Sequence, residues 1–198
     1  MDAVLEQRIR ERIDAEKART EPPPDAVPVP LIPTGRYVDP AFFALEREHL
    51  FPRTWLFAGH ESEWPEPGSY RQFTRSGAPI VVVRGEDGVL RAFYNACRHR
   101  GAPVTRDEGG NARRLTCQYH SWSYGTDGVL KAVPDARSFA GLGVDALGLV
   151  PVSCETADGW VYVRESLEGP SLAEFLGPVV DQMRDLDGPA MRLVGTQV

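Results

Sequence analysis

Cys97-Arg98-His99 and Cys117-Gln118-Tyr119-His120 are the stretches that decide the fold and chemistry of this 198-residue chain. Together they read C-x-H, then 17 residues, then C-x-x-H. They contain two of the three cysteines and two of the four histidines in the sequence. Each stretch pairs one thiol with one imidazole, so the pattern predicts two loops that meet and supply four metal ligands. Gly101 and Gly125 would allow the tight backbone turns that such loops require.

Four ligands in two pairs form the donor set of a Rieske [2Fe–2S] cluster, in which two thiolates hold one iron and two imidazoles hold the other. We therefore expect Cys97 and Cys117 to bind one iron, and His99 and His120 to bind the second. A structural zinc site uses the same residue types, but usually pairs Cys with Cys and His with His along the chain. A catalytic Cys–His pair would use only one cysteine and one histidine and leave the other two unexplained. Burial of all four residues for packing alone explains the spacing less well. The order of the residues favours the cluster and assigns no catalytic residue.

Three Asp-Gly pairs lie close to these stretches, each between two short runs of β-forming residues. They are Asp87-Gly88, Asp127-Gly128 and Asp158-Gly159, and such pairs are typical of the turns of β-hairpins. Three hairpins so close together predict an antiparallel domain. The expected fold class is a mainly β Rieske iron–sulfur domain with an N-terminal helical arm and a short C-terminal helix.

The N-terminal region is expected to be a helix followed by an extended connector. Residues 2–19 carry Leu5, Ile9 and Ile13 at four-residue spacing, which predicts a narrow amphipathic helix. That pattern is more typical of a helix packed on its own domain or on a sister subunit than of one that binds a partner. Six prolines within residues 21–33 predict the connector.

Further helices are expected on both sides of the β region. Asp39-Pro40 predicts a helix start, with an N-cap carboxylate and a proline at the first helical position, and Pro52 predicts its end. Ser171 is expected to cap a short helix. The last residues, Met191–Val198, are typical of the start of a strand. We identify no internal repeat in the sequence.

These patterns predict three regions. Residues 1–36 would form the N-terminal helix and Pro-rich connector. Residues 37–165 would form the Rieske domain, with cluster loops at 95–103 and 115–125. Residues 166–198 would begin a linker to a catalytic domain that this chain lacks.

Composition excludes several classes of function. The chain has 22 basic and 28 acidic residues, a net charge of −6, which argues against general nucleic-acid binding. It has no apolar run of about 18 residues that would span a membrane, and its charged N-terminus lacks the apolar region of a secretory signal. Three cysteines cannot form a disulfide framework, so a reducing cytoplasm is expected.

The sequence around the four ligands resembles the Rieske segment of aromatic-ring-hydroxylating oxygenase α subunits. Asn95–Ala102 and Cys117–Tyr124 carry this resemblance, which covers roughly residues 37–165. Gln118 and Ser121 stand where the family usually has Pro and Gly; neither is a ligand, but Ser121 could place a hydroxyl near the cluster. The upstream matches are Tyr37–Pro40, Thr54-Trp55, Gly59–Glu63, Pro67–Tyr70 and Pro79–Arg84.

The resemblance implies an NAD(P)H-dependent Rieske-type dioxygenase or monooxygenase, supplied with electrons by a ferredoxin or flavin reductase. In that family a catalytic domain holds a mononuclear Fe(II) on two histidines and a carboxylate, usually reached on the adjacent α subunit of a trimer. No histidine follows His120, and a second iron site built from His49 and His60 is not favoured. We therefore expect this chain to be the electron-transfer part of an oxygenase α subunit.

The same residues are compatible with three alternatives. The chain could be one piece of a split oxygenase or a free-standing Rieske electron carrier, although its N-terminal helices and connector exceed what a minimal carrier needs. A structural zinc-binding module is the alternative from another class.

Cysteine positions also predict the redox potential. Rieske proteins of high potential in respiratory chains carry a disulfide between the two ligand loops. Here the third cysteine, Cys154, lies outside both loops. We therefore expect a potential near the lower end of the Rieske range of about −150 to +300 mV, and Cys154 to be a small buried hydrophobic residue.

Charged and aromatic residues surround the ligands. The segment from Cys97 to His120 has five arginines and two acidic residues. These arginines would either attract an acidic electron donor or pair with carboxylates of a neighbouring domain or subunit. Trp122 and Tyr119 are expected to form a packing lid over the site rather than an electron relay.

Overall fold

The computed structural model describes all residues except 1–2, 23–25, 28–29, 140, 142 and 196–198. The chain divides into two compact units, Met1–Val38 and Asp39–Val198. None of the described helices is both long and apolar enough to cross a membrane.

The first unit contains helix α1 (Ala3–Ala18) and the short helix α2 (Gly35–Val38). Helix α1 is the one predicted for residues 2–19, and the Arg10–Glu6 ion pair of 2.7 Å supports one of its turns. Its side chains are all exposed, including those of Leu5, Ile9 and Ile13. The described part of the connector has no regular structure before Thr34.

The second unit begins with the helix predicted at Asp39. The Asp39 carboxylate accepts a hydrogen bond from the Ala41 backbone N–H (2.8 Å) and so caps α3 (Pro40–Leu45). The helix continues as the π-helical turn η1 (Glu46–Leu50), which closes with a bond from the Phe51 N–H to the Glu46 carbonyl (2.9 Å). The predicted start and the predicted end near Pro52 are confirmed.

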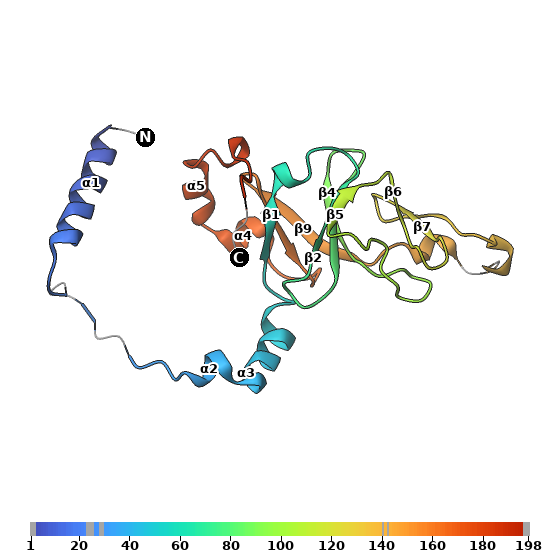
Figure 1. The fold of residues 1–198 in the computed structure, drawn as a ribbon, viewed down its shortest axis with the longest axis horizontal. Coiled ribbons are helices and arrows are strands. Elements are labelled where there is room, and N and C mark those ends of the chain that lie inside the picture. Colours follow the sequence, from blue (N-terminus) through green and yellow to red (C-terminus); the bar gives the residue numbers. More distant parts are fainter. Residues whose placement is uncertain (1–2, 23–25, 28–29, 140, 142, 196–198) are drawn as a thin grey trace. The chain divides into compact units, whose positions relative to one another are not determined.

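A seven-stranded antiparallel sheet forms the body of this unit (Figure 1). Its strand order is β1-β10-β9-β4-β3-β2-β5. Two of the predicted hairpins lie in it, one joining β3 to β4 through Asp87-Gly88 and one joining β9 to β10 through Asp158-Gly159. The strands are β1 (Leu56–His60), β2 (Ser69–Phe73), β3 (Ile80–Arg84), β4 (Leu90–Tyr94), β5 (Gly109–Asn111), β9 (Pro151–Ala157) and β10 (Trp160–Arg164).

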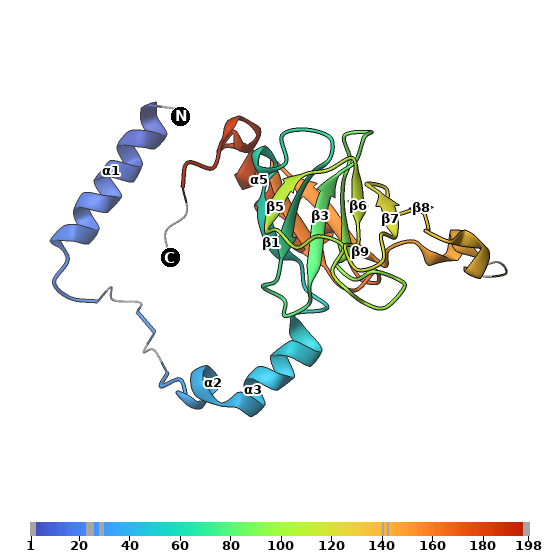
Figure 2. The ribbon, with the colours of Figure 1, turned by 45° about the vertical axis from the view of Figure 1, so that its right-hand side comes forward.

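A second, three-stranded antiparallel sheet has the order β6-β7-β8. Its strands are β6 (Arg114–Thr116), β7 (Ser123–Gly125) and β8 (Leu130–Ala132). The third predicted hairpin, through Asp127-Gly128, joins β7 to β8. Both views place this smaller sheet beside the larger one (Figures 1 and 2). The prediction of a mainly β, antiparallel fold is confirmed.

Strand β3 shows why the two sheets pack together. Its residues Ile80–Val83 are all 0% exposed, as expected for a strand that is covered on both faces. The buried hydrophobic residues form two core clusters, one on each face of β3. Because side chains alternate along a strand, Ile80 and Val82 belong to the first cluster, and Val81 and Val83 belong to the second. This second cluster also contains Cys97 and Cys117, so the larger sheet supports the predicted metal ligands.

Two eight-residue segments correct the expectation that the chain has no internal repeat. Gly85–Ala92 reads GEDGVLRA and Gly125–Ala132 reads GTDGVLKA. In each segment the first Gly N–H bonds to the Val carbonyl at 2.8 Å, and the Asp carboxylate accepts the Val N–H. The repeat is therefore a turn module used twice, once in each sheet.

Short helices complete the unit. They are η2 (Glu61–Glu63), η3 (Ala136–Phe139), η4 (Val144–Leu147), α4 (Leu172–Leu176), α5 (Val179–Arg184) and η5 (Gly188–Ala190). Ser171 caps α4 as predicted, in a reciprocal capping box with Glu174. The strand predicted at the C-terminus is wrong for Met191–Gly195, which are not in a strand; Thr196–Val198 lie outside the described residues.

Candidate functional site

The two predicted ligand loops have the same backbone frame. In the first loop the Gly101 N–H bonds to the Cys97 carbonyl (2.8 Å), and the Cys97 N–H bonds to the Ala102 carbonyl (2.8 Å). In the second loop the Ser121 N–H bonds to the Cys117 carbonyl (2.8 Å), and the Cys117 N–H bonds to the Trp122 carbonyl (2.9 Å). Each cysteine is therefore fixed at the start of a closed turn of identical size.

The fifth residue of each turn has a left-handed backbone. Gly101 has φ +72° and Ser121 has φ +58°. Glycine adopts this conformation freely, whereas a serine there is strained by roughly 1–2 kcal/mol. The expected role of Gly101 is confirmed. Gly125 instead starts the β7–β8 turn, where an added Cβ would lie 2.3 Å from an Asp127 carboxylate oxygen.

The two cysteines lie side by side in the core. Cys97 is 4% exposed and Cys117 is 2% exposed, and neither is in a disulfide. Burial raises the pKa of the Cys97 thiol, and the adjacent Cys117 raises it further, whereas a hydrogen bond from Tyr124 lowers it. The raised pKa of Cys97 favours its neutral thiol, whereas a bound cation would draw off that proton.

Tyr124 holds the Cys97 sulfur. Its hydroxyl lies 3.2 Å from Cys97 Sγ and accepts a hydrogen bond from the Arg98 backbone N–H (2.9 Å). Because a thiolate can only accept hydrogen bonds, the hydroxyl would donate to Cys97 once that sulfur is ionised. Burial and the bond to Cys97 raise the pKa of this tyrosine above its ordinary value, so it stays a donor. No sequence pattern indicates this contact, because Tyr124 precedes a turn and resembles an ordinary strand residue.

The two histidines also lie together. The ring centroids of His99 and His120 are 4.7 Å apart, at an interplanar angle of 67°. Desolvation, the neighbouring His120 and Arg100 lower the pKa of His99, which favours the neutral imidazole that a metal requires. Both histidines are thus brought together on the same two loops that hold the buried sulfurs.

Aromatic side chains surround the histidines. Trp122, 3% exposed, stacks on His99 with ring centroids 5.0 Å apart and an interplanar angle of 6°. The Tyr119 ring centroid lies 3.9 Å from that of His120, but Tyr119 is 56% exposed. The expected packing lid therefore holds for Trp122, whereas Tyr119 is a surface residue beside the site.

A buried amide for which the sequence predicts no role fixes the first loop. Asn95 Oδ1 accepts hydrogen bonds from the Val104 and Thr105 N–H groups (2.9 and 3.0 Å), and Asn95 Nδ2 donates to the Thr105 carbonyl (2.9 Å). Asn95 thereby ties together the two ends of the loop. The one signal in the sequence that could have indicated this role is the position of Asn95, two residues before Cys97.

The four predicted ligands are grouped by type. Within the described ranges, no three His, Cys, Asp or Glu side chains are grouped as they would be around one metal ion. The donors instead form a thiol pair and an imidazole pair. A Rieske [2Fe–2S] cluster requires two sulfurs at one iron and two nitrogens at the other, and these residues match that requirement.

The remaining histidines are accounted for without a metal. His60 ends β1 and is buried, with Nδ1 2.9 Å from Ser62 Oγ and Nε2 2.9 Å from the Gly188 carbonyl. His49 is on the exposed turn η1, 3.7 Å from Glu48. His49 and His60 thus lie on different elements, η1 and β1.

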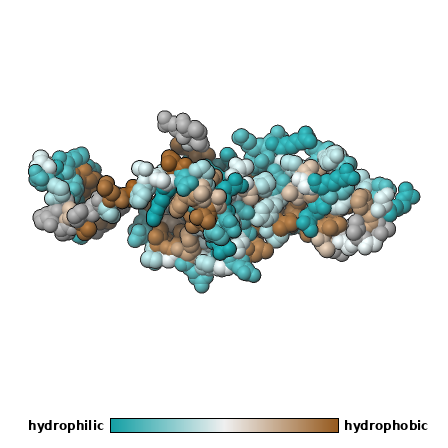
Figure 3. Space-filling view, turned by 90° about the horizontal axis from the view of Figure 1, so that it is seen from below, coloured by the Kyte–Doolittle hydropathy of each residue, from teal (hydrophilic) through white to brown (hydrophobic). Residues whose placement is uncertain are grey.

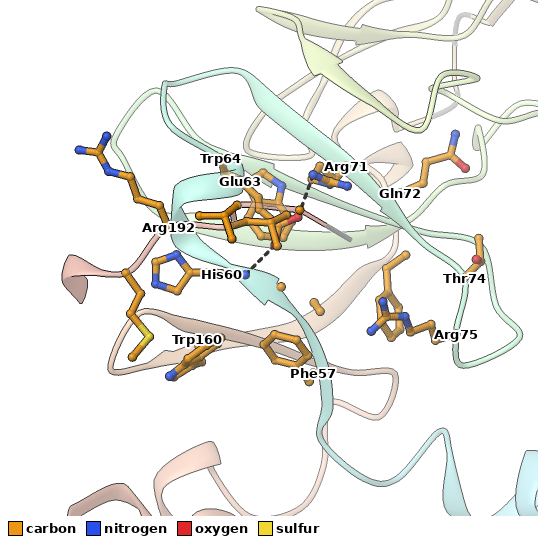
Figure 4. Close-up of a pocket in the computed structure, with 17 residues that line it drawn as sticks. Phe57, His60, Glu63, Trp64, Arg71, Gln72, Thr74, Arg75, Trp160 and Arg192 are labelled. Atoms are coloured by element: carbon orange, nitrogen blue, oxygen red, sulfur yellow. Dashed lines mark hydrogen bonds and ion pairs between the residues drawn. The ribbon is translucent and has the colours of Figure 1, made fainter. Parts of the chain in front are cut away.

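A cavity of about 610 Å³ lies near His60, away from the predicted ligands. Figure 4 shows Glu63 and Trp64 on one side of it and Phe57 and Trp160 on the other. Glu63 is joined there to Arg71 by an ion pair of 2.7 Å. None of the four predicted ligands lines this cavity, so it is not part of the cluster site.

Cys154 behaves as a structural residue. It is half-buried on β9 and packs against the core of the larger sheet. Burial raises its pKa to about 12, so the thiol is not reactive at neutral pH. Its position on β9 also leaves the ligand loops without a partner for a disulfide.

The arginines of the cluster segment are solvent-exposed and carry no intrachain ion pair with any described residue. This holds for Arg98, Arg100, Arg106, Arg113 and Arg114. Figure 3 shows hydrophilic side chains along the upper edge of the right-hand part of the molecule, with hydrophobic ones below them. The positive charge around the site is therefore available to a partner.

Comparison with known proteins matches residues 54–151 to the Rieske [2Fe–2S] domain. The chain is 37% identical over 161 residues to the α subunit of biphenyl 2,3-dioxygenase from Rhodococcus jostii strain RHA1, covering 77% of this chain and 35% of that protein. It is 38% identical to the oxygenase subunit of glycine betaine monooxygenase from Chromohalobacter salexigens, covering 77% and 34%. The chain thus spans about a third of the length of these curated relatives.

Solved structures give the same result. Naphthalene 1,2-dioxygenase from a Rhodococcus species superimposes with a TM-score of 0.75 at 33% identity, covering 78% of this chain and 36% of that one. A quaternary ammonium Rieske monooxygenase, whose structure gives insights into inter-subunit electron transfer, superimposes with a TM-score of 0.73 at 29% identity, covering 77% and 42%. The chain therefore belongs to the Rieske [2Fe–2S] proteins, and its matched residues correspond to the Rieske domain of ring-hydroxylating oxygenase α subunits.

Proposed function

We propose that Cys97 and Cys117 hold one iron of a [2Fe–2S] cluster, and that His99 and His120 hold the other. The observation that carries this proposal is the meeting of a buried thiol pair and an imidazole pair on two loops with the same backbone frame. A cluster bound there would take up and release one electron at a time.

The residues around the ligands have defined tasks in such a site. Tyr124 donates a hydrogen bond to the Cys97 sulfur, which stabilises negative charge on that atom. The core around both cysteines keeps water from the sulfurs. Desolvation and the neighbouring positive charge keep His99 neutral. The core and Tyr124 thus position the sulfurs, and the surroundings of His99 favour the neutral imidazole that binding needs.

The function we assign is electron transfer within a Rieske-type oxygenase. The chain would accept electrons that originate from NAD(P)H through a ferredoxin or flavin reductase, and pass them to a mononuclear iron for O₂-dependent hydroxylation. No histidine follows His120, so we assign that iron to a catalytic domain or adjacent α subunit of a trimer outside these residues. Residues 1–36 would be an arm, residues 37–165 the Rieske domain, and residues 166–198 the start of the linker.

The donor is expected to present an acidic surface. The exposed arginines that have no intrachain ion pair with a described residue, among them Arg113 and Arg114, support this partner. Replacing Arg113 by Glu should slow reduction by an acidic donor at low ionic strength, and the difference should shrink as salt is added. A rate unchanged at low salt would contradict the assignment of this surface.

The positions of the cysteines support a low potential, near the lower end of the range of about −150 to +300 mV, because Cys97 and Cys117 have no further cysteine beside them in the loops. The alternatives are a free-standing electron carrier and a zinc module. A reducing cytoplasm fits a chain with three free cysteines.

Metal analysis combined with EPR of the dithionite-reduced protein tests the proposal. We expect two iron atoms per chain and a Rieske-type signal. One zinc per chain with no EPR signal would establish the zinc module instead. A midpoint potential well above zero would contradict the low-potential assignment without removing the cluster.

A further inference from the structure

The two histidines of the site have different surroundings. His99 is half-buried and lies against Trp122, whereas His120 is exposed and lies against the exposed Tyr119. A third segment of the chain adds to this difference. Phe139 meets His99 edge-on, with ring centroids 5.7 Å apart at 87°.

Phe139 also holds the tryptophan. Its ring lies edge-on to Trp122, with centroids 5.2 Å apart at 87°. Edge-to-face aromatic pairs at this separation attract each other in addition to burying apolar surface. One phenylalanine thus contacts both members of the His99–Trp122 stack and limits the movement of each.

Phe139 belongs to neither ligand loop. It is the last residue of η3, on the connection between β8 and β9, and it packs half-buried against the core cluster that contains both cysteines. Its side chain offers only apolar surface. Its contribution to the site is therefore shape and the exclusion of water from one side of the His99 ring.

We propose that Phe139 is a positioning residue for the cluster, which clamps Trp122 flat against His99 and shields that imidazole from water. This inference rests on the proposed ligand assignment. Reduction adds one negative charge to the site, and water stabilises added charge better than apolar surface does. Solvent exposure is one of the factors that set the potential of an iron–sulfur cluster, so the shield lowers the midpoint potential.

The test compares Phe139→Ala and Phe139→Leu with the unchanged protein and with Phe175→Ala. Phe175 is an exposed phenylalanine on α4 and is in none of the aromatic contacts of the site, so it serves as the matched control. Each protein is assayed for iron content, midpoint potential by spectroelectrochemistry, and EPR of the reduced state.

We expect Phe139→Ala to keep its iron, to show a raised midpoint potential, and to show shifted EPR g-values because the His99 ring is freer to rotate. Phe139→Leu should raise the potential by less, and Phe175→Ala should leave it unchanged. A potential equal to that of the unchanged protein in an iron-replete Phe139→Ala would overturn the inference. If the alanine variant loses iron, an unchanged potential in Phe139→Leu overturns it. Failure of the ligand assignment is a different result, since the unchanged protein would then lack the Rieske signal.

Discussion

The two ligand loops share one pattern of backbone hydrogen bonds, but their histidines lie in different surroundings. Both cysteines start a closed turn with the same pair of hydrogen bonds, although the histidine comes two residues later in one loop and three in the other. His99 is stacked against Trp122, whereas His120 is exposed. The frame therefore fixes the sulfurs equally, and the packing around each loop decides how each imidazole meets the solvent.

Loss of either cysteine should have the largest effect. Cys97→Ser and Cys117→Ser should each abolish the cluster, because a hydroxyl does not replace a thiolate in the sulfur pair. The two variants should fail to the same degree, since their frames are equivalent. Iron content and visible absorption measure this outcome.

Cys154→Ser is the control for both cysteine variants. It should retain full iron, because Cys154 packs on β9 outside both loops. A normal cluster in the Cys97→Ser variant would contradict the assignment of Cys97 as a ligand.

The second largest effect should be a loss of stability, and it should be greater for the first ligand loop than for the second. Asn95→Ala removes a buried amide that ties the ends of the first loop with three hydrogen bonds, leaving buried backbone groups unpaired at a cost of about 2–3 kcal/mol. At the base of the second loop, the Thr116 and Ser123 hydroxyls share a single contact of 2.9 Å. Urea unfolding should give a clearly smaller loss for Thr116→Val, and equal losses would show that the loops are supported alike.

Tyr124→Phe should act on one sulfur only. It deletes the hydroxyl that donates to Cys97 Sγ, a bond worth about 1 kcal/mol. Reduction makes the sulfurs more negative, so the bond favours the reduced state and its loss should lower the midpoint potential. The matched substitution Tyr119→Phe, next to His120, should leave the potential unchanged. A midpoint potential unchanged by Tyr124→Phe would show that the hydrogen bond to Cys97 does not distinguish the first loop from the second.

The smallest effect should be on stability, at the fifth residue of each turn, where the backbone is left-handed. Ser121→Gly should stabilise the protein by about 0.5 kcal/mol, because relief of strain of roughly 1–2 kcal/mol is partly offset by the entropy of glycine, about 0.5–1 kcal/mol. Gly101→Ser in the other loop should have the opposite sign. The free energy of unfolding measures both, and a destabilising Ser121→Gly would show that the Ser121 side chain contributes contacts of its own.

Much of the fold follows from local patterns in the sequence. The Asp-Gly turns, the Asp39 cap and the Ser171 cap depend on a few neighbouring residues, so each is predicted at the correct place. The expected pairing of Cys with Cys and His with His follows from the donor set. The order of the strands, by contrast, depends on packing between distant residues.

Features that depend on contacts over long separations in the chain could not be predicted. Phe139 reaches His99 from a different segment, and His60 is held by Gly188, which is 128 residues away. The predicted C-terminal strand is wrong for Met191–Gly195, because a short run of strand-forming residues does not by itself supply the neighbouring strand that pairing requires. The eight-residue repeat is hard to see in the sequence because its copies are short and differ at two positions, with Glu86 and Arg91 in one and Thr126 and Lys131 in the other.

The most direct test of the central claim is EPR-detected hyperfine spectroscopy of the reduced protein labelled with ¹⁵N-histidine. If His99 and His120 are both ligands in different surroundings, the spectrum should contain two inequivalent ¹⁵N couplings, and His49→Gln and His60→Gln variants that retain the fold should keep both. A reduced cluster with no ¹⁵N-histidine coupling, or with only one, would contradict the account.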